Sequence, residues 1–186
     1  MKRCAWGSND PHMIEYHDTE WGVPVHDDRL WFEFITLDAF QAGLSWQIIL
    51  HKRENFRKAF HNFNVKRIAK YTAQDVKRLL ADTGIVRNRL KIAATITNAQ
   101  RFIEIQKEFG SFDKYIWQFV GGKAIRNKLK SIKEIPATSA ESDALSKDLQ
   151  ARGFRFVGST ICYAFMQSGG LVNDHTTDCF RYRQVR

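Results

Sequence analysis

Two pairs of metal-binding residue types stand at opposite ends of this 186-residue chain. Cys4 and His17 lie near its start, while His175 and Cys179 lie near its end, spaced so that a helical turn would place both side chains on one face. Two cysteines and two histidines make a complete tetrahedral zinc site, and a closed site of this kind is structural rather than catalytic. One metal bound by all four residues would join the two ends of the chain, which is the strongest constraint that the sequence places on the fold.

The stretch over residues 4–22, CAWGSNDPHMIEYHDTEWG, is the part of the chain that most needs such a metal. It shows little helical periodicity, so we expect it to be irregular, and ordering its backbone costs roughly 1–2 kcal/mol per residue. The spacing between Cys4 and His17 matches no standard zinc motif, and His12 and Asp18 are competing ligands. The alternative without a metal is a set of unpaired structural residues.

The net charge of +9 and the pI of about 9.6 indicate a polyanionic partner such as nucleic acid. A soluble basic protein without such a partner is the alternative. No apolar run approaches the ~20 residues that span a bilayer, and residues 1–10 lack the apolar core of a secretory signal. We therefore expect a cytoplasmic protein that does not contact a membrane. Three cysteines form no even disulfide framework, which favours a metal or buried thiols.

Apolar residues recur at helical spacing through most of the chain, whereas strand-like alternation is confined to residues 154–157. The predicted fold class is all-α, in one domain over residues 1–186. An arrangement in two lobes, one holding the metal and the termini and one holding a hairpin at about 150–170, stays open. The expected helices run from Asp27 and Asp28 to Gly43, over 46–60, from Thr72 and Asp75 to Gly84, over 92–103 with Gly110 as the stop, over 112–120, from a Thr138–Glu141 capping box to Gly153, and over 159–168.

The last two of these helices flank a turn that contains Gly158, which is the pattern of a helix-hairpin-helix element. A glycine there exposes backbone N–H groups, and the following helix N-terminus adds its positive dipole end, so together they suit a DNA phosphate. Arg152 and Arg155 add positive charge beside the turn. The same residues also fit an ordinary core hairpin with two solvated arginines.

Five segments match a known family in order and at consistent spacing. They are RCAW at 3–6, YHDTEWGVP at 16–24, FQAGLSW at 40–46 with KREN at 52–55, SDALSKDL at 142–149, and RGFRFVGSTICYAFMQSGGLVNDH at 152–175. On these residues the chain resembles the 3-methyladenine DNA glycosylase I family of the helix-hairpin-helix superfamily.

The resemblance implies a monofunctional enzyme that flips 3-methyladenine out of alkylated double-stranded DNA and hydrolyses its glycosidic bond, and it fits a monomer. It implies zinc on Cys4, His17, His175 and Cys179. It also implies a base pocket built from Trp6, Tyr16, Trp21, Asp38 and Trp46, with Asp38 as the catalytic carboxylate. The DNA-binding residues expected from the resemblance and the hairpin are Gln41, Gly43, Leu44, Arg155 and Gly158.

Position 38 departs from the family pattern, which usually has glutamate there. Asp38 keeps the carboxylate but retracts it by one methylene. The superfamily also has a catalytic aspartate shortly after the second hairpin helix, a role that the resembled family lacks and that we do not assign to Asp174.

The proposed chemistry suits these residue types. Methylation at N3 makes adenine cationic, so the leaving group is already activated, and aromatic faces attract such a ring by about 0.5–2 kcal/mol per contact. A buried carboxylate accepts hydrogen bonds from the exocyclic amine, and Leu44 fits an apolar wedge. Two rival functions also fit these residues: a DNA-damage or DNA-structure binding module without catalysis, and a zinc hydrolase with an open metal position.

Overall fold

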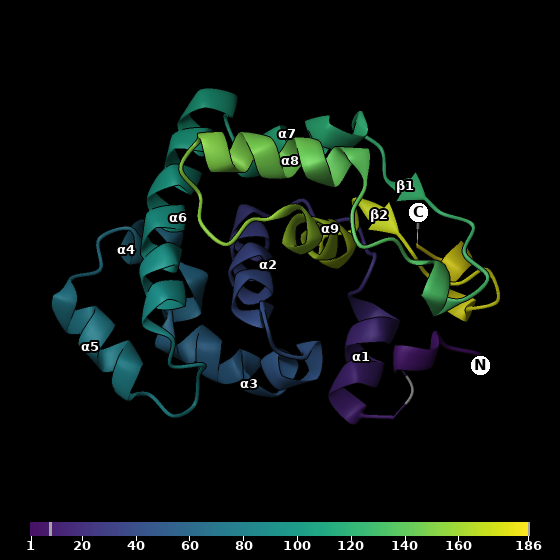
Figure 1. Ribbon diagram of the computed structural model, residues 1–186, viewed down its shortest axis with the longest axis horizontal. Coiled ribbons are helices and arrows are strands. Elements are labelled where there is room, and N and C mark those ends of the chain that lie inside the picture. Colours follow the sequence, from purple (N-terminus) through teal and green to yellow (C-terminus); the bar gives the residue numbers. More distant parts are fainter. Residues whose placement is uncertain (8, 186) are drawn as a thin grey trace.

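The computed structural model describes residues 1–7 and 9–185 and is mostly helical (Figure 1). The α-helices are α1 (Pro11–Thr19), α2 (Asp28–Gln41), α3 (Trp46–Ala59), α4 (Val65–Ile68), α5 (Ala73–Ala81), α6 (Arg89–Phe109), α7 (Phe112–Ile116), α8 (Ala140–Ala151) and α9 (Ser159–Ser168). The shorter elements are η1 (Ala5–Gly7), η2 (His61–Phe63), η3 (Trp117–Val120), η4 (Ile132–Glu134), η5 (Phe180–Arg183) and the strands β1 (Ile125–Arg126) and β2 (Val172–Asn173). No helix in this described part combines the length and the apolar character that crossing a membrane requires.

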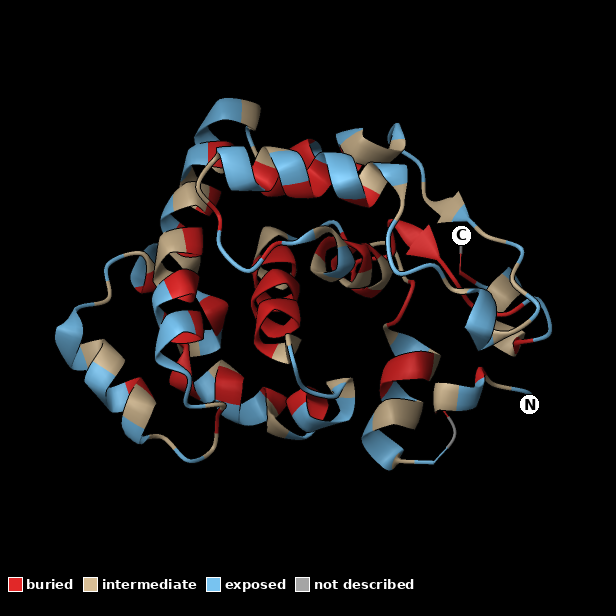
Figure 2. Ribbon diagram, in the orientation of Figure 1, coloured by how far each residue is buried: buried red, intermediate tan, exposed pale blue. Residues whose placement is uncertain are grey.

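Helix α2 forms the centre of the structure. Every residue from Trp31 to Phe40 is buried, and Figure 2 shows the helix as an almost continuous red element surrounded by the others. Its packing partners include α3, α6, α7 and α9. A helix buried on all sides accepts a polar side chain only where a partner or a ligand compensates for lost hydration. Each buried polar residue of α2 therefore indicates a partner or a ligand site, and Asp38 is one of these residues.

The two ends of the chain meet on one side of the structure (Figure 1). Phe180 donates its backbone N–H to the carbonyl of Lys2, and Val25 donates to Gly169 at the end of α9. Gly170 permits this close approach, because its φ is +71° and an added Cβ would lie 2.2 Å from the carbonyl carbon of Val23. Strands β1 and β2 add a short parallel pair, with Ile125 opposite Val172.

Several predicted helix boundaries agree with the structure. Asp27 caps α2 by accepting from the N–H of Leu30, and Gly110 ends α6 in the left-handed conformation. Thr72 and Asp75 form the expected capping box of α5, and α9 spans the predicted residues.

Other local predictions were wrong. Residues 11–19 form α1 rather than an irregular segment, because the Asp10 side chain caps the N–H of Met13 and Pro11 occupies the first turn. The capping box of α8 uses Ser139 and Ser142 instead of Thr138 and Glu141, since the serine hydroxyl at 142 reaches the Ser139 N–H.

The remaining differences concern short segments. His175 and Cys179 are joined by a turn closed by the Cys179 N–H on the Thr176 carbonyl, not by a helical turn. Residues 112–120 divide into α7 and η3, and residues 154–157 lie in the hairpin rather than in a strand. The observed strands are two residues long each, so the structure is mostly helical rather than all-α.

Candidate functional site

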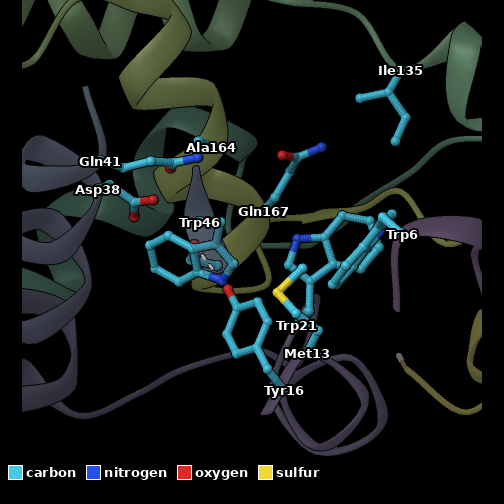
Figure 3. A pocket seen from close by; sticks show the side chains of 11 residues that line it. Trp6, Met13, Tyr16, Trp21, Asp38, Gln41, Trp46, Ile135, Ala164 and Gln167 are labelled. Carbon is cyan, nitrogen blue, oxygen red and sulfur yellow. Dashed lines mark hydrogen bonds between the residues drawn. The ribbon is translucent and has the colours of Figure 1, made fainter. Parts of the chain in front are cut away.

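A cavity of about 250 Å³ opens between α1, the end of α2, the start of α3 and the end of α9. It is smaller than the ~300–1,000 Å³ typical of pockets for drug-sized ligands, so it suits a compact ring system. Its walls are formed by Trp6, Met13, Tyr16, Trp21, Asp38, Gln41, Trp46, Ile135, Ala164, Gln167 and Ser168 (Figure 3).

Aromatic rings form most of the cavity wall, and they come from separate elements. Trp6 in η1 meets Trp21 edge to face, with ring centroids 4.8 Å apart and planes inclined by 80°. Tyr16 in α1 meets Trp46, the first residue of α3, at 5.3 Å and 51°. All five residues expected in the base pocket thus line one cavity. Faces of this kind bind flat rings and attract cationic ones.

Asp38 places an unpaired carboxylate at the end of this aromatic cavity. Its side chain is 1% exposed, and neither carboxylate oxygen has a hydrogen-bond partner within the described residues. Burial raises the pKa of Asp38 well above its ordinary value, and the nearby Ser168 hydroxyl and the charge of Arg53 offset only part of this effect. Buried polar groups in proteins are nearly always paired, so two free acceptor oxygens facing a cavity indicate a ligand that donates hydrogen bonds or carries positive charge.

A second unpaired polar atom faces the same cavity. The indole Nε1 of Trp46 is buried and makes no hydrogen bond to any described residue. The hydroxyl of Tyr16, in contrast, donates to Ser168 Oγ at 3.1 Å. The cavity therefore offers free acceptors on Asp38 and a free donor on Trp46, a mixed set that suits a heterocyclic base.

An ion-pair network lies behind Asp38. Glu33 of α2 is fully buried, and its Oε1 accepts from Arg53 Nε and Arg57 Nη2, each at 2.7 Å. Burial alone would raise the pKa of Glu33, but hydrogen bonds and charges from these two arginines hold it below its ordinary value. The network keeps Arg53 buried near the cavity, where its charge acts on Asp38.

The four predicted metal ligands form one buried cluster. Their candidate ligand atoms all lie within 4.8 Å of one another. Cys179 Sγ is 3.5 Å from His17 Nε2 and 3.6 Å from His175 Nδ1, and Cys4 Sγ is 3.6 Å from His175 Nδ1. Tetrahedral zinc with ordinary bond lengths would separate sulfur and nitrogen ligands by about 3.6 Å, so the donor set fits the ion.

The histidine partners on the outer side support the same arrangement. His17 Nδ1 is 2.8 Å from Asp18 Oδ1, and His175 Nε2 is 3.0 Å from the Trp21 carbonyl. These acceptors fix the ring protons on the outer nitrogens, so the lone pairs of the inner nitrogens point into the cluster, where that of His17 also accepts from the Cys4 N–H at 3.3 Å. Asp18 therefore serves as a partner of His17, while the His12 ring lies against His51, with centroids 5.0 Å apart.

The predicted DNA-binding residues lie on two segments. Gln41 ends α2 and lines the cavity, Gly43 has a φ of +79°, and Leu44 is 38% exposed. Arg155 and Gly158 lie in the turn between α8 and α9, where Asn98 holds the backbone N–H and C=O of Arg155 at 2.8 and 3.0 Å. An added Cβ at Gly158 would meet open space.

Sequence reasoning missed several cavity residues, among them Met13, Ile135, Ala164, Gln167 and Ser168. The signal for the last two was present, because Gln167 and Ser168 are polar residues that directly follow the largely apolar run over residues 161–166 of α9. Asp174 does not line the cavity; it is fully buried and binds Asn127, Tyr163 and Gln167.

Comparison with known proteins identifies the family. The sequence pattern of the methyladenine glycosylases matches residues 6–182. DNA-3-methyladenine glycosylase 1 of Escherichia coli (strain K12) is 48% identical over 182 residues, which are 98% of this chain and 97% of that protein.

Solved structures agree with this match. A crystal structure of 3-methyladenine DNA glycosylase I has a TM-score of 0.93 at 51% identity, covering 96% of this chain and 98% of its own. The enzyme of that name from Staphylococcus aureus, solved to explain recognition of 3-methyladenine, has a TM-score of 0.93 at 36% identity, covering 97% and 96% of the two chains. The chain is therefore a member of the methyladenine glycosylase family.

Proposed function

We propose that this protein is a monofunctional DNA glycosylase that hydrolyses the N-glycosidic bond of 3-methyladenine in alkylated double-stranded DNA. The observation that carries the proposal is the unpaired, buried carboxylate of Asp38 at the end of an aromatic cavity. A cationic methylated base with an exocyclic amine supplies both the positive charge and the hydrogen-bond donors that this carboxylate lacks.

The same geometry accounts for catalysis without a strong general acid. The alkylated base leaves readily because it is cationic while still bonded to the sugar, so the protein has to flip it, hold it and stabilise the positive charge that develops on the sugar. Tyr16, Trp21 and Trp46 would enclose the ring, and Asp38 would accept from its amine and stabilise the charge. Asp38 lines the cavity although it is shorter than the glutamate usual in the family.

Binding of DNA is assigned to two segments. Leu44 is an exposed apolar side chain beside the cavity residue Gln41, which suits a wedge filling the gap left by a flipped base. The turn with Arg155 and Gly158 would bind phosphate as a helix-hairpin-helix element. The net charge of +9 favours binding of DNA, which is a polyanion. We propose that the protein acts on DNA as a cytoplasmic monomer.

Zinc is proposed as a structural ion held by Cys4, His17, His175 and Cys179. When bound, it would supply a rigid link between the two ends of the chain. All four positions of a tetrahedral site would be filled by these residues, so water would have no open position on the ion. This distinguishes the proposal from a zinc hydrolase.

The direct test is release of free 3-methyladenine from methylated DNA, measured by chromatography together with duplex binding. We expect release by the unsubstituted protein, a loss of at least about tenfold in Asp38→Asn, and no change in Glu104→Gln, which alters an exposed carboxylate on α6. Binding of DNA without any release would contradict the proposal and support a non-catalytic binding module.

A further inference from the structure

Gln167 brings a side-chain amide to the cavity, and Asp174 behind it fixes how that amide is turned. Gln167 lines the cavity from α9, and its Nε2 donates to Asp174 Oδ2 at 2.8 Å (Figure 3). The backbone of Gln167 is also held, because its carbonyl accepts from the Gly22 N–H at 3.0 Å. The backbone carbonyl and the side-chain amide nitrogen of Gln167 therefore both have fixed partners.

The chemistry of Asp174 determines which amide atom is left for the cavity. Asp174 Oδ1 accepts from Asn127 Nδ2 at 2.6 Å, and Oδ2 accepts from Tyr163 Oη at 2.7 Å as well as from Gln167. A carboxylate accepts hydrogen bonds and does not donate them, so the NH₂ group of Gln167 must face it. The carbonyl oxygen Oε1 is then directed away from Asp174, and Figure 3 shows it on the side of the amide nearer to Gln41.

We propose that Gln167 is a specificity-determining residue of the cavity and that Asp174 is the positioning residue that keeps Gln167 Oε1 available as a hydrogen-bond acceptor. The proposal rests on the function proposed above and extends it to the choice of base. It also gives a role to Asp174, whose side chain is fully buried and does not line the cavity.

A cavity with fixed acceptors distinguishes between methylated purines. Adenine carries an exocyclic amine where guanine carries a carbonyl oxygen. The amine can donate two hydrogens, one to the Asp38 carboxylate and one to Gln167 Oε1, whereas the guanine oxygen would place acceptor against acceptor. A freely rotating amide could turn its NH₂ toward that oxygen, and the hydrogen bond to Asp174 prevents this rotation. The preferred substrate class is therefore a cationic purine with an amine at this position.

The test uses one methylated DNA sample that contains both 3-methyladenine and 3-methylguanine. The initial release rates of the two bases are measured chromatographically in the same reaction, and their ratio is compared between proteins. Any unfolded fraction lowers both rates equally and cancels from the ratio. We expect Gln167→Met, which keeps the length but removes both polar atoms, to lower the ratio of 3-methyladenine to 3-methylguanine release by about tenfold.

Asp174→Asn tests the positioning role, because an asparagine can donate to Gln167 Oε1 and let the amide turn over. We expect the release ratio to fall in this variant as well, by about threefold. The matched control is Tyr163→Phe, which removes another hydrogen bond to the same Asp174 oxygen without touching the cavity, and its ratio should be unchanged. Zinc content is measured in all three variants because Asp174 precedes the proposed ligand His175.

The outcomes test the proposed function, the specificity role and the positioning role separately. Failure of the unsubstituted protein to release 3-methyladenine would contradict the proposed function. Release by the unsubstituted protein with an unaltered ratio in Gln167→Met would overturn the specificity role alone. A fall in Tyr163→Phe as large as that in Asp174→Asn would overturn the positioning role.

Discussion

At Asp38, the proposed function and the stability of the fold place opposite demands on one side chain. In the free protein its carboxylate is buried without hydrogen-bond partners from the described residues, which destabilises the fold. The same feature is what a cationic base would compensate. Active sites often retain such costs because activity depends on them.

Replacing Asp38 by asparagine should therefore stabilise the protein while reducing excision. We expect a gain of about 1–2 kcal/mol in the free energy of unfolding at neutral pH, or about 2–8 °C in Tm. Thermal unfolding followed by circular dichroism, compared with Glu104→Gln, measures the change. A lower Tm in Asp38→Asn would show that the carboxylate has a stabilising partner in solution.

The pH dependence of this difference follows from the raised pKa of Asp38. Between the ordinary carboxyl pKa and the raised one, the folded protein binds a proton that the unfolded chain has lost, so stability due to this group falls as pH rises. Asparagine does not titrate, so the stability of Asp38→Asn does not fall with pH in this way. The Tm advantage of the variant should be largest at pH 7–8 and should shrink as pH falls toward about 3, below the ordinary carboxyl pKa, where both states of the parent are protonated.

At the scale of elements, the DNA contact proposed for the turn between α8 and α9 can be tested separately from folding. Gly158 has an ordinary φ of −62°, and an added Cβ would meet no atom within 4 Å. A larger side chain should therefore leave the fold intact but block close approach of a phosphate to the backbone. We expect Gly158→Leu to weaken duplex binding by about tenfold or more, with Gly158→Ala intermediate.

The measurement is the Kd for a duplex with an abasic-site analogue, set beside the Kd for free 3-methyladenine from tryptophan fluorescence. Free-base binding should be unchanged in both Gly158 variants. Equal weakening of both affinities would mean that the turn supports the cavity rather than the DNA.

Lys91 of α6 holds the end of α2 from which the proposed wedge projects. Its buried Nζ donates to the carbonyls of Phe40 at 2.8 Å and Ala42 at 2.6 Å, which flank Gln41. Lys91→Met should loosen this segment and lower excision by about tenfold, since charged hydrogen bonds of this kind contribute about 1.5–3 kcal/mol each. Lys107→Met, at an exposed lysine of the same helix, is the control. An excision rate that stays at the parent value would remove Lys91 from the positioning of Leu44.

The sequence predicted those helices best whose ends and apolar faces are set by residues close together in the chain. Helix α9 was predicted with its observed ends because the turn that contains Gly158 leads directly into a mostly apolar run. Helix α1 was missed because His17 belongs to the Cys/His cluster and Tyr16 lines the cavity, so the inner side of the helix lacks the usual apolar pattern. The cap by Asp10 and the proline at residue 11 were the better signals.

The site showed the same division. The aromatic residues and Asp38 were identified through motif resemblance, and the structure brings them to one cavity. The polar character of Gln167 was visible in the sequence, but its hydrogen bond to Asp174 and that of Lys91 to the Phe40 carbonyl could not be predicted, because both depend on how the chain packs. Spacing alone does not reveal which buried polar groups meet.

At the scale of the whole molecule, the metal cluster and the cavity share the same N-terminal segment. Cys4 and His17 belong to the cluster, while Trp6, Tyr16 and Trp21 line the cavity between and beside them. The Trp21 carbonyl also binds His175 directly at 3.0 Å. The proposed zinc would therefore fix one wall of the cavity by joining the chain ends, and its loss should weaken base binding although its proposed role is structural.

Cys4→Ser tests this coupling, with Cys162→Ser as the matched control, because both cysteines are buried and only Cys4 belongs to the cluster. We expect Cys4→Ser to lose zinc, to lower Tm by roughly 6–12 °C, and to weaken binding of free 3-methyladenine. Cys162→Ser should keep its zinc and its affinity. Zinc is quantified by elemental analysis and affinity by tryptophan fluorescence below the Tm of the variant. A full zinc complement in Cys4→Ser would refute the ligand assignment, whereas zinc loss with unchanged base affinity would show that the cavity wall holds without the metal.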